Sequence, residues 1–133
     1  MIGINSRRVL NSLVPDFFKL SEISKKIKCN GYFVFTLDSD DPGILAHGRM
    51  FAPVIGINED PVTGNANGPL GAFLIEHKLI DQQQGKFHFK AKQGEAMGRE
   101  GIIEVEVDVK NSVPVTVRIG GNAAVVFKTE LQI

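Results

Sequence analysis

The segment from Glu59 to Gly68 (EDPVTGNANG) holds the residue types in this chain that are best suited to chemistry. It opens with two adjacent carboxylates, Glu59 and Asp60, and a carboxyl group with a raised pKa can act as a general acid or base. The glycines and asparagines that follow lead into an apolar helical pattern. A helix start leaves backbone N–H groups free to bind an anion. The pattern therefore indicates a site for a carboxylate or another small anion beside an acid–base group.

A purely structural role also explains this segment. Asp60 or Thr63 could cap the helix, and the glycines could simply turn the chain. The segment is not a phosphate-binding GxxxxGK[ST] loop, because no Lys follows the glycines. Arg49 lies upstream and could pair with a buried carboxylate or with a substrate. We expect Glu59 to stabilise the loop or to face water.

The flanking sequence predicts the elements that position this segment. Apolar residues at helical spacing predict a helix from Pro15–Asp16 to Ile27 and another over Pro69–Ile80. Runs that are apolar or alternating predict strands over Tyr32–Leu37, Ala46–Pro53, Lys86–Lys92, Ile102–Val109, Pro114–Ile119 and Ala123–Phe127, with Gly120–Gly121–Asn122 as a hairpin turn before the last of them. We expect an α+β single domain over residues 1–133, in which a curved, antiparallel-rich sheet holds the second helix and the first lies outside.

Composition excludes several classes of protein. The 133 residues are 43% hydrophobic, and 15 basic side chains balance 15 acidic ones without forming a basic stripe, so we expect no nucleic-acid partner. The single cysteine, Cys29, cannot form an intrachain disulfide. No apolar run approaches the ~20 residues of a membrane span, so we expect a soluble, cytoplasmic protein without a membrane partner. His47, His77 and His88 lie in separate elements without metal-ligand spacing, and we expect them at the surface or its boundary and no metal site.

Several motifs, in a fixed order, resemble one family. Arg49–Pro53 (RMFAP) followed by Glu59–Gly71 (EDPVTGNANGPLG) is similar to the signature of the phenazine-biosynthesis-like (PhzF-like) isomerases. The downstream elements Gln93–Gly94 with Met97–Arg99, and Gly120–Gly121 with Ala124–Val126, match the family's later motifs in order and spacing. Each piece alone is weak, but together they cover residues 10–133.

The resemblance implies a lobe of a diaminopimelate-epimerase-like fold, a mixed sheet wrapped around a central helix. Two such lobes face each other across a cleft, where the helix N-termini bind the substrate carboxylate and no metal or organic cofactor is used. By position, Asp60 corresponds to the family's second-lobe active-site aspartate, so we expect it to be catalytic. The resemblance places the substrate-binding residues at Thr63, Gly64, Asn65, Ala66 and Asn67. Gly64 and Ala66 would supply N–H groups, and Asn65 stands where many members carry a serine.

The chain departs from the family in one respect. The family's first lobe carries the catalytic glutamate in an N-L-S-E-T-like segment and a histidine in a G-H-A-T-like loop, and neither string occurs here. Three hypotheses follow: a homodimer that rebuilds the cleft and isomerises a small carboxylic acid, a split enzyme completed by a separate first-lobe chain, or a truncated, non-catalytic homologue that only binds a small carboxylate.

Overall fold

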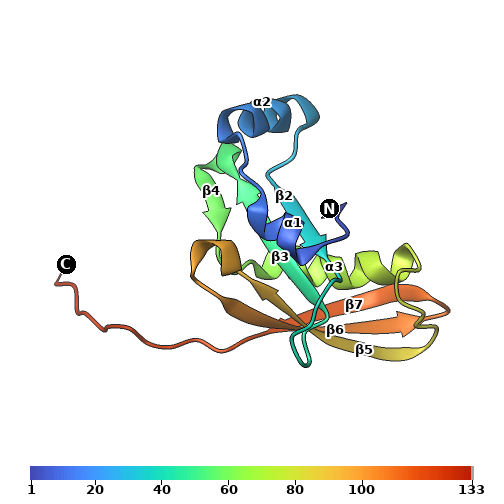
Figure 1. Ribbon diagram of the computed structural model, residues 1–133. Coiled ribbons are helices and arrows are strands. Elements are labelled where there is room, and N and C mark those ends of the chain that lie inside the picture. Colours follow the sequence, from blue (N-terminus) through green and yellow to red (C-terminus); the bar gives the residue numbers. More distant parts are fainter. Residues whose placement is uncertain (133) are drawn as a thin grey trace.

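One mixed seven-stranded sheet curves around helix α3 (Gly64–Glu76) in the computed structural model, which describes residues 1–132 (Figure 1). The strands follow the order β1 (Ile2–Gly3), β2 (Tyr32–Thr36), β3 (Ala46–Ala52), β5 (Gly85–Gln93), β6 (Gly101–Lys110) and β7 (Val113–Gly120), and β4 (Ile57–Asp60) pairs with β3 beside this path. The β1–β2 and β3–β5 pairs are parallel and the others are antiparallel. The predicted α+β, antiparallel-rich mixed sheet around a central helix is confirmed.

The remaining helices are short. They are α1 (Arg7–Ser12), α2 (Phe17–Ile27) and the 3₁₀ turns η1 (Pro53–Ile55) and η2 (Glu95–Met97). The predicted cap of α2 is present, since Asp16 accepts a hydrogen bond from the Lys19 N–H at 3.0 Å. The sequence did not predict α1, because a six-residue helix with only Leu10 buried has no readable period.

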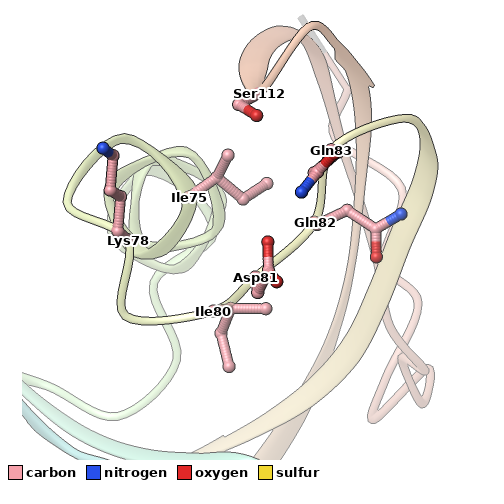
Figure 2. Close-up of a pocket in the computed structure, with 7 residues that line it drawn as sticks. All are labelled: Ile75, Lys78, Ile80, Asp81, Gln82, Gln83 and Ser112. Atoms are coloured by element: carbon pink, nitrogen blue, oxygen red, sulfur yellow. The ribbon is translucent and has the colours of Figure 1, made fainter.

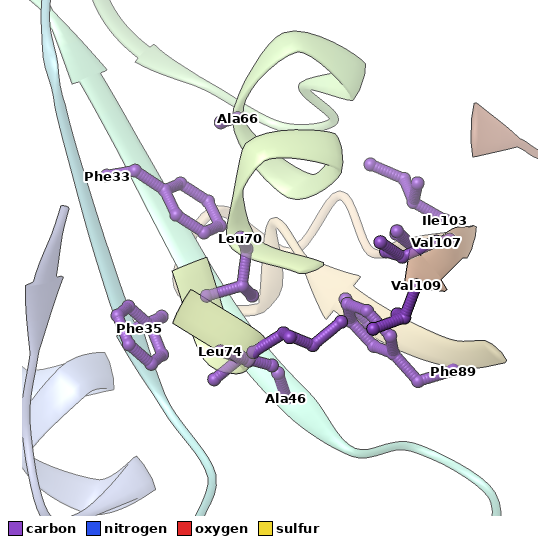
Figure 3. Packing of buried hydrophobic residues seen from close by; sticks show 13 residues of the cluster. Phe33, Phe35, Ala46, Ala66, Leu70, Leu74, Phe89, Ile103, Val107 and Val109 are labelled. Carbon is purple, nitrogen blue, oxygen red and sulfur yellow. The ribbon is translucent and has the colours of Figure 1, made fainter. Parts of the chain in front are cut away.

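The main core lies between α3 and the concave face of the sheet (Figure 3). Leu70 and Leu74 are fully buried and pack among aromatic and aliphatic side chains from β2, β5 and β6. Gly71 allows the close approach, because a Cβ at this position would lie 2.7 Å from Val107 and 3.0 Å from Val105. This packing fixes α3, and therefore its first residue, relative to the sheet.

Helix α3 begins five residues earlier and ends four residues earlier than the sequence predicts. Pro69 lies inside the helix and cannot donate to the carbonyl of Asn65. Both residues are exposed, so water can satisfy that carbonyl. The prediction was wrong because burial of Ala66, Asn67 and Gly68 holds the first turn, which outweighs the poor helix propensity of the glycines and asparagines.

The last predicted strand, Ala123–Phe127, is also absent. Residues 121–132 carry no regular secondary structure and run away from the sheet beyond the end of β7 (Figure 1). Tight hairpin turns of two or three residues need at least one residue with positive φ, and none of Gly120, Gly121 and Asn122 has it. The predicted hairpin turn is therefore wrong.

Among the residues described, no helix has the length and apolarity needed to cross a membrane.

Candidate functional site

The end of β4 and the start of α3 bring Asp60 next to Thr63. The Thr63 hydroxyl donates a hydrogen bond to Asp60 Oδ2 at 2.5 Å. Thr63 occupies the N-cap position of α3, but its side chain makes no capping bond, and no hydrogen bond from the helix to Asp60 is present in the described chain. The hydroxyl therefore orients the carboxylate, so the capping interpretation does not describe these side chains.

Gln93, the last residue of β5, is 1% exposed and forms hydrogen bonds with this loop from its buried side. Its Nε2 donates to the Asp60 carbonyl at 2.5 Å and to Thr63 Oγ1 at 3.0 Å. Its Oε1 accepts from the Thr63 N–H at 3.2 Å and from Asn67 Nδ2 at 2.9 Å. Because Thr63 Oγ1 already accepts from Gln93, its own proton is directed to Asp60. The buried amide therefore fixes both the loop backbone and the orientation of the acid–base candidate.

Sequence reasoning missed the role of Gln93. The alternation of β5 offered a signal. Phe87, Phe89 and Ala91 point toward the core, and Gln93 follows at the same spacing, so its side chain lies on the same buried face. A polar side chain in a buried phase needs hydrogen-bond partners, so it marks a position where a network is built.

The first turn of α3 presents free backbone donors. Within residues 1–132, the N–H groups of Gly64 and Asn65 have no acceptor, whereas those of Ala66 and Asn67 donate to the Thr63 carbonyl at 3.2 and 3.1 Å. Asn65 is exposed and Gly64 is half-buried. Two free N–H groups at the positive end of a helix dipole suit an anion such as a carboxylate.

The predicted site residues thus divide into two groups. Asp60, Thr63, Gly64 and Asn65 meet at the helix entry, beside one another. The Asn67 side chain is fully buried, and its Oδ1 has no partner in the described part of the chain. Ala66 is buried and its N–H is used by the helix. Asn67 and Ala66 therefore support the entry from inside rather than face it.

Arg49 could have paired with a carboxylate of the chain or with a substrate, and the structure shows a bidentate ion pair with Glu59. Arg49 Nε and Nη2 donate to the two Glu59 oxygens at 2.9 and 2.8 Å. Its Nη1 donates to the carbonyls of Leu10 and Leu13, which ties α1 to the sheet. Arg49 is 6% exposed, and each of its three guanidinium nitrogens donates within the chain. Glu59 is therefore a structural partner, which leaves Asp60 as the acid–base candidate of the adjacent pair.

A second polar cluster, which we call the α1 charge cluster, comprises Arg7, Asp41, His47, Lys92 and Glu95. His47 is fully buried, so its predicted surface position is wrong. Its Nδ1 lies 2.7 Å from Glu95 Oε2 and its Nε2 lies 2.9 Å from Ser39 Oγ. These residues come from three distant parts of the chain, at residue 7, residues 41–47 and residues 92–95, and spacing along the chain gives no signal that they meet.

Ligand-type atoms of Asp41, His47 and Glu95 all lie within 4.8 Å of one another, an arrangement that could suit a metal ion. However, Arg7 already donates to both carboxylates, and Lys92 pairs with Asp41. Hydrogen bonds from Lys92 and Arg7 lower the pKa of Asp41 to about 2. Burial raises the pKa of Glu95, but hydrogen bonds from Arg7 and His47 outweigh it and bring the pKa below its ordinary value. The positive charges of Arg7 and Lys92 therefore already neutralise the carboxylates of Asp41 and Glu95.

An open pocket of about 390 Å³ lies at the opposite end of α3 (Figure 2). Its wall includes Ile75, Lys78, Ile80 and Asp81, from the last turn of α3 and the residues after it. It shares no residue with the Asp60–Asn67 entry. We therefore assign the candidate site to the entry and its free donors.

Comparisons with known proteins give the same family as the motifs. The family model described as "Phenazine biosynthesis-like protein" matches residues 1–129. An uncharacterized isomerase of Clostridium acetobutylicum is 66% identical over 131 residues, which are 98% of this chain and 43% of the relative. The uncharacterized isomerase YddE of Escherichia coli is 45% identical over the same shares of the two chains.

Solved structures support the fold. The Bacillus anthracis phenazine biosynthesis protein of the PhzF family aligns with a TM-score of 0.69 at 22% identity, covering 89% of this chain and 44% of that one. A predicted epimerase of Pseudomonas aeruginosa aligns with a TM-score of 0.54 at 27% identity, covering 95% of this chain and 42% of that one. The chain thus spans less than half the length of these relatives, and it belongs to the phenazine biosynthesis-like (PhzF-like) isomerase family.

Proposed function

We propose that this chain contributes one wall of a cofactor-free acid–base site that shifts a proton on a small carboxylic acid. The observation that supports this most directly is the position of Asp60. Its carboxylate stands at the N-terminus of α3, beside the free N–H groups of Gly64 and Asn65, and is oriented by Thr63. A carboxylate bound by these donors would place the carbon next to it within reach of Asp60.

The contacts of each residue suggest its role in the site. Gly64 and Asn65 would bind the substrate carboxylate through backbone N–H groups and the helix dipole. Asp60 would take or return the proton, and Gln93 would keep the Thr63 hydroxyl aimed at Asp60. The opposite wall, with a second acid–base group, would come from another copy of the chain or from a complementary first-lobe chain.

Proton exchange tests this function without knowledge of the true substrate. Small cyclic and amino carboxylic acids are incubated with the protein in D₂O, and incorporation of deuterium next to the carboxylate is followed by NMR. We expect exchange that falls by roughly 10²–10⁴-fold in Asp60→Asn, the range that general acid–base groups contribute. Asp16→Asn is the matched control, because it changes an exposed carboxylate outside the entry that caps α2 and pairs with Lys19.

The assay is repeated with an added chain that covers the remaining part of a family member. Exchange equal in wild type and Asp60→Asn would contradict the role of Asp60. Exchange absent under both conditions would contradict the enzymatic proposal. In that case, carboxylate binding that persists at the helix entry would support the second candidate function, a non-catalytic binding module, which the two free donors favour.

A further inference from the structure

Strand β7 leaves one edge of the sheet open. It is the last strand of the sheet, and within residues 1–132 it pairs only with β6. Val117 and Ile119 pair with Val107 and Val105, which are buried, so they take the face toward α3. Nevertheless, Val117 is 37% exposed and Ile119 is 50% exposed. The apolar face of the sheet therefore ends at a strand with free backbone groups, which is a template for another strand.

The C-terminal tail (residues 121–132) has the pattern of a strand that could fill this place. Ala123, Val125 and Phe127 alternate with Ala124, Val126 and Lys128, so one face is continuously apolar and the other becomes polar toward the end. Val125 is 77% exposed and Phe127 is 79% exposed. Such exposure of a β-prone segment is unfavourable in water, and it indicates a segment that packs against something else.

The backbone directs the tail away from its own edge. The tail runs on beyond β7 rather than returning along it (Figure 1), and neither Gly120 nor Gly121 takes the positive φ of a tight turn. Strand β7 and the tail thus form one extended ribbon. Two such ribbons can pair antiparallel about a two-fold axis at Gly121, so that each tail lies along the other's β7.

The side chains fit this arrangement. With the axis at Gly121, Val125 of one copy lies opposite Val117 of the other, and Ala123 lies opposite Ile119, so apolar residues share the face toward α3. Val126 then falls on the outer, solvent side, like Arg118. The chain has 15 basic and 15 acidic residues, so two copies do not repel each other by net charge.

We propose that two copies of this chain exchange their C-terminal tails, and that each tail adds a strand to β7 of the other copy. The exchange bears on the candidate site, because the Ile119 side chain lies against Gly64 at the start of α3. The incoming tail therefore borders the helix entry. This inference specifies the homodimer within the proposed function, but its test measures association and needs no substrate.

Light scattering over a micromolar concentration series is the first test. We expect the wild type at twice the 14.5 kDa of one chain. Val125→Asp should give a monomer, because it places a charge on the buried face of the exchanged strand. Val126→Asp, one residue away on the outer face, should remain a dimer. Both residues are exposed within a single chain, so neither variant threatens its fold.

Cross-linking tests the register in a Cys29→Ser background. Val117→Cys with Val125→Cys should form interchain disulfides and run as a dimer on a non-reducing gel, since directly opposed strand residues have suitable Cα separations. Val117→Cys with Val126→Cys, whose side chains lie on opposite faces, should remain monomeric. A wild-type monomer, a disulfide within one chain, or dimers equally sensitive to both aspartates would overturn the proposal. None of these results would affect the proton-exchange test with a complementary chain.

Discussion

The α1 charge cluster and the helix entry at Asp60–Asn67 are both polar networks, but they differ in what they leave unpaired. In the cluster, His47 contacts Glu95 and Ser39 through its two ring nitrogens, and Arg7 spans Asp41 and Glu95. At the entry, two backbone donors have no acceptor among the described residues, and they lie beside a half-buried carboxylate. A network that is closed within the chain supports the fold, whereas open donors beside an oriented carboxylate mark a place for a ligand.

The two networks are adjacent in sequence through Gln93–Gly94–Glu95. Gln93 serves the entry and Glu95 serves the charge cluster, so one turn after β5 anchors both. The difference between the two networks can therefore be tested by substitutions in the entry alone, in the charge cluster alone, and in the turn that both share.

Removing the central carboxylate of the cluster should have the largest effect. Glu95→Ala leaves Arg7 and the fully buried His47 without their shared partner. Breaking a buried ion pair costs about 3–5 kcal/mol, and because Arg7–Glu95 is partly buried and Arg7 keeps Asp41, we expect about 3 kcal/mol, the lower end of that range. The Glu95 side chain is 11% exposed. Urea unfolding measures the loss. The matched control is Glu104→Ala, which removes a 48% exposed carboxylate of β6 that pairs with Lys90. The closed-network interpretation fails if the two variants lose similar stability.

Changing the shared turn should cost somewhat less and should affect both networks. Gly94 has φ +87°, and a Cβ there would lie 2.2 Å from the Arg99 carbonyl oxygen and 2.8 Å from that of Pro61. We expect Gly94→Ala to cost roughly 2–3 kcal/mol, from positive-φ strain and the displaced backbone. Gly98 is the matched control: its φ is +64°, but a Cβ there would meet no atom within 4 Å. Gly98→Ala should therefore lower the free energy of unfolding by only about 1 kcal/mol. Equal costs in thermal unfolding would show that the contacts with Pro61 and Arg99 do not matter.

Acid should weaken the cluster through Asp41. Because hydrogen bonds from Lys92 and Arg7 lower its pKa from 3.8 to about 2, its stabilising contribution is complete above the unfolded pKa. The contribution is lost as the pH falls from about 4 to about 2. Asp41→Asn should therefore lower stability at neutral pH and flatten this part of the curve in urea titrations at stepped pH. Curves that stay parallel to the wild type from pH 4 to 2 would contradict the assignment.

The smallest effect on stability should come from the entry itself. Asp60→Asn keeps an oxygen that can accept from Thr63, so we expect a change within about 0.5–1 kcal/mol. The same variant should lose proton exchange, which separates function from folding. A loss of stability as large as that of Glu95→Ala would place Asp60 among the structural residues instead.

The sequence predicted most of the sheet because β2, β3, β5, β6 and β7 have clear apolar runs or period-two alternation. It misplaced the start of α3, since the fold buries Ala66–Gly68 and this overrides local propensity. It could not find the charge cluster, whose members come from residues 7 to 95 and meet only through the sheet topology. The motif located Asp60, Thr63, Gly64 and Asn65 at one entry, but the hydrogen bonds that hold Asp60 and Thr63 come from Gln93, which lies 30 residues after Thr63.

The most direct test of the account is whether the entry binds a carboxylate. ¹H–¹⁵N NMR spectra of the labelled chain are recorded during titration with benzoate and, as an uncharged control of the same shape, with benzamide. We predict saturable shifts that are largest for the backbone amides of Gly64 and Asn65 and that appear only with benzoate. Shifts located elsewhere, or equal shifts with benzamide, would contradict the assignment of the site to the N-terminus of α3.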